Sequence, residues 1–151
     1  FNAQQLIYPY DESGKYKVEA SYWGASNTTS FTVGRLGVNT FKILDAGSFD
    51  LIGNPTIYFI RGQTIQISAT LKNLDIIPHN YIYLIQITDN NAKTIFIGWL
   101  SSTMYQNQTV RQTIGTIINT PGTYTATILV WDDWSKPTPL APAITIIFHI
   151  T

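Results

Sequence analysis

His79 and His149 are the two histidines of the chain, and they are its first candidates for general-base chemistry. Nucleophilic catalysis needs a nucleophile, a base and an orienting group close together. His79 follows Pro78 in an expected loop, whereas His149 alternates with Phe148 and Ile150 in an expected strand. Neither histidine belongs to a recognisable catalytic constellation. We therefore expect no catalytic residue, no cofactor and no enzymatic activity.

The Asp132-Asp133 pair is the most concentrated acidic site in the second half of the chain. Together with Asp89, Asn90 or backbone carbonyls it could supply the oxygen ligands that Ca²⁺ prefers. Adjacent carboxylates at a strand end point in different directions, so a solvated loop is the favoured interpretation and no metal site is predicted. The absence of cysteine excludes disulfides and thiolate metal ligands.

Several aromatic side chains are expected at the surface: Trp23, Trp131, Trp134 and Tyr105. They could stack on sugars, as in a carbohydrate-binding module. The favoured interpretation is that they cover the ends of a folded unit or meet a neighbouring domain. Trp99 is the expected core indole.

The charge balance excludes some partners. Hydrophobic residues make up 44% of the chain and charged residues 12%, and the formal net charge is +0. A nucleic-acid-binding protein needs a basic surface to replace counterions. No Lys/Arg cluster is present to hold an anionic membrane surface, and no apolar run approaches the length of a membrane span. We expect neither nucleic-acid binding nor direct membrane insertion.

The elements that must position these side chains are strands. Ile, Thr, Tyr, Val and Phe dominate, and no segment sustains helical periodicity. In 64–71, Ile65, Ile67, Ala69 and Leu71 alternate with Thr64, Gln66, Ser68 and Thr70, which predicts a strand with the first set facing inward. The predicted strands are 2–8, 15–22, 28–33, 40–44, 57–60, 64–71, 81–88, 94–100, 109–118, 124–131 and 143–151, with a loop over 72–80 and a hairpin turn at 89–92.

One strand pair occurs twice. Gly14-Lys15-Tyr16 followed by Phe31-Thr32-Val33 matches Gly122-Thr123-Tyr124 followed by Phe148-His149-Ile150. The two copies lie about one sandwich domain apart. We therefore predict an all-β chain in which an incomplete N-terminal β segment (1–36) precedes an immunoglobulin-like two-sheet sandwich of seven to eight strands (37–151). The turn before Tyr124 suits a tyrosine corner.

The C-terminal motifs resemble a known group. Gly122-Thr123-Tyr124 running into 130–134 (VWDDW), then 137–140 (PTPL) and Phe148-His149-Ile150, is similar to the repeated immunoglobulin-like domains of archaeal secreted and cell-surface proteins, including surface-layer and filament proteins. The resemblance covers 38–151, with 14–33 as a partial second copy. It implies a structural glycoprotein at the cell surface without catalytic residues. The sequons Asn27-Thr28-Thr29 and Asn107-Gln108-Thr109 make Asn27 and Asn107 the expected carriers of N-linked glycans.

The incomplete N-terminal segment suggests how such a protein assembles. Our leading hypothesis is donor-strand complementation, in which this segment completes a sheet in a neighbouring copy and so builds a head-to-tail homopolymer, either a filament or a surface layer. The expected donor residues are Phe1, Ala3, Leu6, Ile7, Tyr16, Val18, Phe31 and Val33. Two alternatives stay open: an extracellular glycan- or protein-binding sandwich module that uses the loop 131–142, and an interior slice of a longer surface protein.

Overall fold

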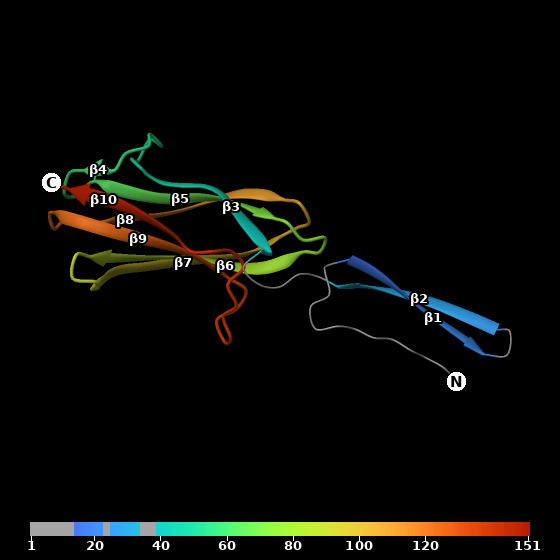
Figure 1. Cartoon of the computed structure of the whole chain (residues 1–151). Coiled ribbons are helices and arrows are strands. Elements are labelled where there is room, and N and C mark those ends of the chain that lie inside the picture. The colour runs from blue at the N-terminus through green and yellow to red at the C-terminus, as the bar shows by residue number, and fades with distance from the viewer. Residues whose placement is uncertain (1–13, 23–24, 34–38) are drawn as a thin grey trace.

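A computed structural model describes residues 14–22, 25–33 and 39–151, with side chains from residue 39 onward. These residues form ten strands and no helix (Figure 1). No helix in this part of the chain is therefore long and apolar enough to cross a membrane. The strands are β1 (Gly14–Tyr22), β2 (Ala25–Val33), β3 (Phe41–Phe49), β4 (Tyr58–Phe59), β5 (Thr64–Asn73), β6 (His79–Asp89), β7 (Thr94–Met104), β8 (Thr109–Ile117), β9 (Gly122–Trp131) and β10 (Ile144–Ile150).

Eight of these strands form a two-layer sandwich. One sheet has five strands in the order β4-β10-β9-β6-β7, and the other has three in the order β3-β5-β8. The pairs are antiparallel except for β10 with β4, which is parallel. The two sheets lie face to face in Figure 1. The predicted all-β, immunoglobulin-like sandwich is confirmed.

The core follows the two-residue period of the strands. On β5, Ile65, Ile67, Ala69 and Leu71 are all buried, as predicted. The opposite face of β5 is not fully solvated, however, because Ser68 is also buried and its hydroxyl lies 2.6 Å from the Thr113 hydroxyl on β8. β5 is the central strand of its sheet, so neighbours on both sides cover that face.

The prediction that Trp99 is the core indole is wrong. Trp99 is 58% exposed, because the alternation on β7 turns Gly98 and Leu100 toward the core and Trp99 away from it. Phenol and phenyl rings fill the large aromatic positions of the core instead: Phe41, Phe59, Tyr81, Tyr83, Tyr124 and Phe148.

Two predicted turns are confirmed and one predicted loop is too long. The Tyr124 hydroxyl donates to the Thr120 carbonyl at 2.8 Å, which is the tyrosine-corner contact. The β6–β7 hairpin turns at 89–92, with Ala92 at φ 59°. The loop expected at 72–80 is shorter, because β5 continues to Asn73 and β6 begins at His79.

The N-terminal strands pair with each other. β1 and β2 form a two-stranded antiparallel sheet whose register runs from Gly14↔Val33 to Tyr22↔Ala25 and sets Tyr16 opposite Phe31. β2 begins three residues earlier than predicted, at Ala25 rather than Thr28. The predicted strand 2–8 lies outside the described residues, as do the expected donor residues Phe1, Ala3, Leu6 and Ile7 and the aromatic residue Trp23.

Candidate binding cleft and open sheet edge

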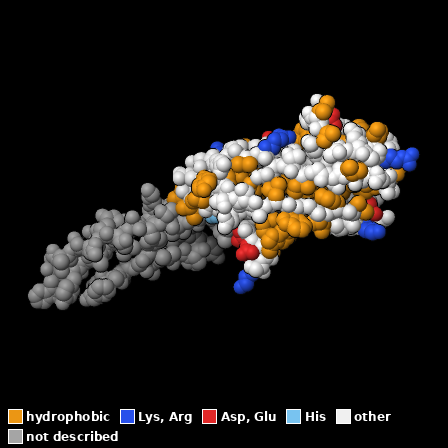
Figure 2. Space-filling view, turned by 180° about the vertical axis from the view of Figure 1, so that it is seen from behind, with side chains coloured by type: hydrophobic (Ala, Val, Ile, Leu, Met, Phe, Trp, Pro, Cys, Tyr) orange, Lys and Arg blue, Asp and Glu red, His pale blue; other side chains and the backbone are white. Residues whose placement is uncertain are grey.

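Three tryptophans meet on the outer face of the five-stranded sheet. Trp134 lies at right angles to both of its neighbours: its ring centroid is 5.6 Å from that of Trp99 and 6.0 Å from that of Trp131. Together they border a depression of about 450 Å³ whose other lining residues are Leu84, Gln86, Ile97 and Leu129. We call this depression the tryptophan cleft. Figure 2 shows that hydrophobic side chains also gather on the surface of the sandwich, in patches between polar ones.

The loop that carries Trp134 is fixed at both ends. The Asp132 carboxylate accepts the backbone N–H groups of Asp133 (2.7 Å) and Thr138 (2.6 Å), which draws the loop back on itself. Leu140 is fully buried, and it bonds through its N–H to Val130 (2.8 Å) and through its carbonyl to Phe41 (2.8 Å). The loop between Trp131 and Leu140 is therefore held in place and forms one wall of the cleft.

A second, polar depression of about 390 Å³ shares Trp134 with the tryptophan cleft. Its lining combines hydroxyls, an amide and the carboxylates of the loop: Asn80, Tyr81, Ile82, Ser101, Ser102, Thr103, Asp132 and Asp133. The backbone N–H of Ser135 bonds to the Asp133 carboxylate and lowers the pKa of that carboxyl below its usual value. Asp133 is therefore ionised at neutral pH, and no lining residue of either depression is a Lys or Arg.

The acidic pair is engaged with its own loop rather than arranged around an ion. Asp132 and Asp133 each accept backbone N–H groups within 132–138. Asp89 accepts the N–H groups of Asn91 and Lys93 in the β6–β7 turn. Among the described residues no group of three or more His, Cys, Asp or Glu side chains could hold a metal ion.

The sandwich has four sheet edges, and β7 is the least protected of them. β3 carries Lys42, Asp45 and a bulge between Ile43 and Asp45, whereas β4 has two residues. β8 carries Arg111, which pairs with Asp45 at 3.3 Å. β7 has eleven residues without charge or proline, and its pairing with β6 is regular from Phe96 to Met104. Charges, bulges and short strands are the usual protections of an edge, so β7 is open to a further strand.

The two histidines lie on different strands, and each has a polar partner. His149 faces away from the core beside Phe148 and Ile150, stacks on Tyr58 at 5.3 Å and contacts the Thr123 hydroxyl at 3.0 Å. His79 is the first residue of β6 rather than a loop residue, and its Nε2 lies 2.7 Å from the Asp75 carboxylate.

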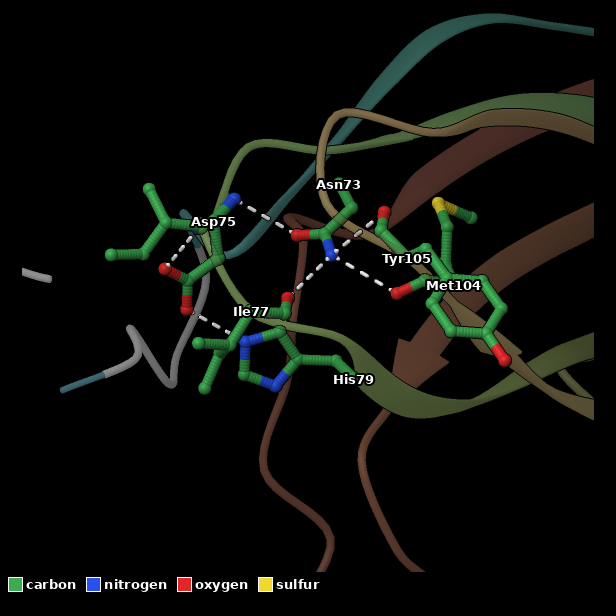
Figure 3. Close-up of polar contacts among 7 residues, drawn as sticks. Asn73, Asp75, Ile77, His79, Met104 and Tyr105 are labelled. Atoms are coloured by element: carbon green, nitrogen blue, oxygen red, sulfur yellow. Dashed lines mark hydrogen bonds and ion pairs between the residues drawn. The ribbon is translucent and has the colours of Figure 1, made fainter. Parts of the chain in front are cut away.

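Asp75 and His79 belong to a polar cluster at one end of the sandwich (Figure 3). The buried Asn73 side chain is at its centre: its Nδ2 donates to the carbonyls of Ile77 (2.9 Å), Met104 (3.1 Å) and Tyr105 (3.2 Å). Its Oδ1 accepts the Asp75 N–H at 2.9 Å. These bonds tie the β5–β6 connection to the end of β7. The cluster is thus a structural clamp.

One expected glycan carrier lies in a turn and the other on a strand. Asn107 is exposed in the β7–β8 turn at φ 55°, a left-handed conformation that asparagine tolerates better than most residues. Asn27 lies on β2 opposite Ala20. Tyr105, expected at the surface, is 64% exposed in the same turn as Asn107.

Sequence reasoning anticipated that Trp131 or Trp134 is exposed, and Trp134 is 49% exposed. It missed that Trp99 joins them, and that Leu84 and Leu129 face outward beneath them. Strict alternation along β7 was the available signal, because Phe96, Gly98 and Leu100 define its inner face. The contact between β7 and the loop after β9 depends on the order of the strands in the sheet, which cannot be predicted from the sequence pattern.

The sequence matches no protein-family model and has no significant relative among curated proteins. Its structure is similar to the C-terminal domain of wzt, with a TM-score of 0.66 and 12% identity over 79% of this chain and 77% of that chain. The CARDB domain of a Pyrococcus furiosus protein, solved in complex with di-metal ions, has a TM-score of 0.50 and 14% identity over 74% of this chain and 92% of that domain.

Domains of larger enzymes share the same arrangement. A β-D-mannosidase from Dictyoglomus thermophilum matches with a TM-score of 0.53 and 16% identity, over 83% of this chain and 14% of the enzyme. At these identities the similarity shows a common fold alone. Strands β3 to β10 have an immunoglobulin-like β-sandwich fold, and the site residues must be judged from their own geometry.

Proposed function

We propose that this protein is a structural subunit of an extracellular archaeal assembly, a filament or a surface layer, whose copies are joined by β-strand complementation. The observation that carries the proposal is the open β7 edge. Its row of backbone N–H and C=O groups can accept a strand from a neighbour, and no charged side chain on β7 opposes that pairing.

The N-terminal hairpin supplies the complementary half of the contact. β1 and β2 form a sheet of two strands, and an isolated hairpin is marginally stable in water. A third strand from a neighbour would stabilise it. Because the hairpin and the β7 edge are different surfaces of one chain, each copy can give and receive, which produces a head-to-tail polymer.

The surface composition supports an extracellular setting. Charged residues make up 12% of the chain, so Thr, Ser, Asn and Gln supply much of its polarity. Asn107, in one of the two sequons, is exposed in a turn where an N-linked glycan would project into solvent. In this proposal the partners are further copies of the chain or neighbouring surface-layer domains, and no chemical step is involved.

Electron microscopy of the native material, with the intact mass of its denatured polypeptide, tests the proposal. We expect filaments or lattices built from chains near 16.9 kDa plus any glycan. The fragment 38–151 should stay folded and unassembled. A much larger polypeptide would join the modules covalently instead, and polymers formed by 38–151 alone would exclude the N-terminal segment as donor.

A charge on the β7 edge tests the acceptor. Ile97→Lys places an ammonium group at a half-exposed position of β7, where an edge lysine blocks strand addition. Thr127→Lys is the matched control, because Thr127 faces outward on β9, a strand of the same sheet that is paired on both sides at this residue. We expect Ile97→Lys to abolish polymers and Thr127→Lys to retain them. Equal assembly of both variants would rule out the β7 edge.

A further inference from the structure

The tryptophan cleft lies on the outer face of the five-stranded sheet, beside the β7 edge, and it has the composition of a small-molecule site. Binding clefts combine apolar and aromatic walls with a few placed polar groups. Here exposed indoles and Leu129 form the apolar part, and Gln86 places an amide in the same depression. Gln86 Nε2 donates to the Thr94 hydroxyl at 2.7 Å, which orients the amide.

The cleft is pre-organised. Trp134 is perpendicular to both of its aromatic neighbours, which leaves indole surface on a wall as well as on the sheet face. Its loop is held by the Asp132 carboxylate on one side and by buried Leu140 on the other. A site that is ordered before binding loses less conformational entropy when a ligand enters.

The polar depression extends the cleft in one direction. Beyond Trp134 the lining changes from apolar groups to hydroxyls and carboxylates, among them Ser101 and Asp133. Because the two depressions share Trp134, a ligand longer than one ring can contact both. The arrangement suits a ligand with apolar faces and a rim of hydrogen-bond donors.

We propose that the tryptophan cleft and the polar depression together bind a neutral oligosaccharide. A pyranose presents a face of C–H groups, which are attracted to the negative face of an indole, and a rim of hydroxyls. Those hydroxyls donate to the carboxylates of Asp132 and Asp133 in charge-assisted hydrogen bonds. Neither depression has a Lys or Arg in its lining, so uronic or sulfated sugars would meet carboxylates without a counter-charge.

Titration of the full chain with oligosaccharides tests this assignment. The probes are neutral oligomers of glucose, mannose, galactose and N-acetylglucosamine, with oligogalacturonate as the acidic counterpart, followed by tryptophan fluorescence and calorimetry. We expect saturable binding of at least one neutral oligomer, and affinity at least about tenfold weaker for oligogalacturonate. Trp134→Ala should weaken neutral-sugar binding about tenfold or more, whereas Tyr105→Ala, at an exposed aromatic outside the cleft, should leave it unchanged.

A charge substitution provides a second readout that does not depend on the stability of the loop. Gln86→Lys places a cation in the tryptophan cleft and should increase the affinity for oligogalacturonate relative to the neutral oligomers. Absence of binding by every neutral oligomer would overturn the proposal, as would unaltered binding by Trp134→Ala. A fluorescence shift that depends on protein concentration without sugar would assign the face to self-association instead. Trp134 lies outside β7, so Trp134→Ala leaves the backbone of that edge unchanged, and a variant that forms polymers without binding sugar separates the two proposals.

Discussion

At the scale of single residues, the Asn73 side chain joins two connections of the sandwich through its hydrogen bonds. One amide serves the carbonyls of Ile77, Met104 and Tyr105 and the N–H of Asp75, all where the β5–β6 and β7–β8 connections approach each other. A buried polar group that loses its partner costs more than an average hydrogen bond contributes. Neither connection can therefore relax easily if this side chain is lost.

We expect Asn73→Ala to destabilise the sandwich by about 3 kcal/mol, because two buried and two partly buried hydrogen bonds would be lost at once. Asn90→Ala is the control: Asn90 is exposed in the β6–β7 turn, and its substitution should cost less than about 0.5 kcal/mol. Urea unfolding of the fragment 38–151 measures both. Equal stability of the two variants would show that water replaces the Asn73 amide without loss.

Tyr83 makes the stability of the sandwich sensitive to alkaline pH. Its ring is fully buried, and burial raises the pKa of its hydroxyl well above the usual value near 10. The unfolded chain therefore releases this proton first. The contribution of Tyr83 is fully present below pH 10 and falls by about 1.4 kcal/mol per pH unit above it, until the folded state ionises.

Tyr83→Phe removes this ionisation. The hydroxyl lies 3.5 Å from the Ile67 carbonyl, at the limit of a hydrogen bond, so at pH 7 the variant should match the native stability within about 1 kcal/mol. Above pH 10 its stability should fall less steeply than that of the native chain. Tyr105→Phe, which removes an exposed hydroxyl, should retain the native slope. Parallel slopes for native chain and Tyr83→Phe in urea unfolding at pH 7 to 11 would contradict the argument.

At the scale of elements, β7 packs so closely against β8 at Gly98 that no space is left for a side chain there. A Cβ built on Gly98 would lie 2.7 Å and 2.8 Å from the Phe96 ring and 2.9 Å from the Ile114 side chain. Gly115, on β8, has its nearest such contact at 3.8 Å, from Thr64. A glycine-to-alanine substitution therefore tests close packing at Gly98, and the same substitution at Gly115 is the control.

We expect Gly98→Ala to cost about 1 to 3 kcal/mol through overpacking, and Gly115→Ala to be tolerated. Because the Phe96 ring must move to admit the new methyl group, the near-UV circular dichroism should change with Gly98→Ala and stay constant with Gly115→Ala. Thermal unfolding gives the stability difference. A Gly98→Ala variant as stable as Gly115→Ala would mean that the two sheets separate at this point without penalty.

The strands and turns also show which parts of the structure can be predicted from the sequence. The alternation in 64–71 predicted β5 and its buried face, and Gly122 with Tyr124 predicted the corner that begins β9. The tryptophan cleft was not predicted, because Trp99 was assigned by its residue type rather than by its place between Gly98 and Leu100. The position of Trp134 depends on the hydrogen bonds between Asp132 and Thr138 and between Leu140 and Val130. These bonds follow from the conformation of the loop, which the hydrophobic periodicity of the sequence does not predict.

At the scale of the whole molecule, charge has a small part in both the fold and the proposed contacts. The sequence has nine Lys and Arg against nine Asp and Glu. The ion pair between Arg111 and Asp45 is about half exposed on each side, and exposed pairs of this kind contribute little to stability. Strand addition at β7 would instead rest on backbone hydrogen bonds and on the apolar side chains of that edge.

Assembly should therefore be nearly independent of salt. Between about 50 mM and 500 mM NaCl, screening weakens contacts between exposed charges severalfold, but backbone pairing is unaffected. We expect the lowest protein concentration that supports polymers, measured by sedimentation, to change by less than about twofold over this range. Lowered solubility at high salt is monitored with the fragment 38–151, which should stay unassembled throughout. A polymer that dissolves as salt rises would show that ion pairs join the subunits, and the uncharged β7 edge would then not be the acceptor.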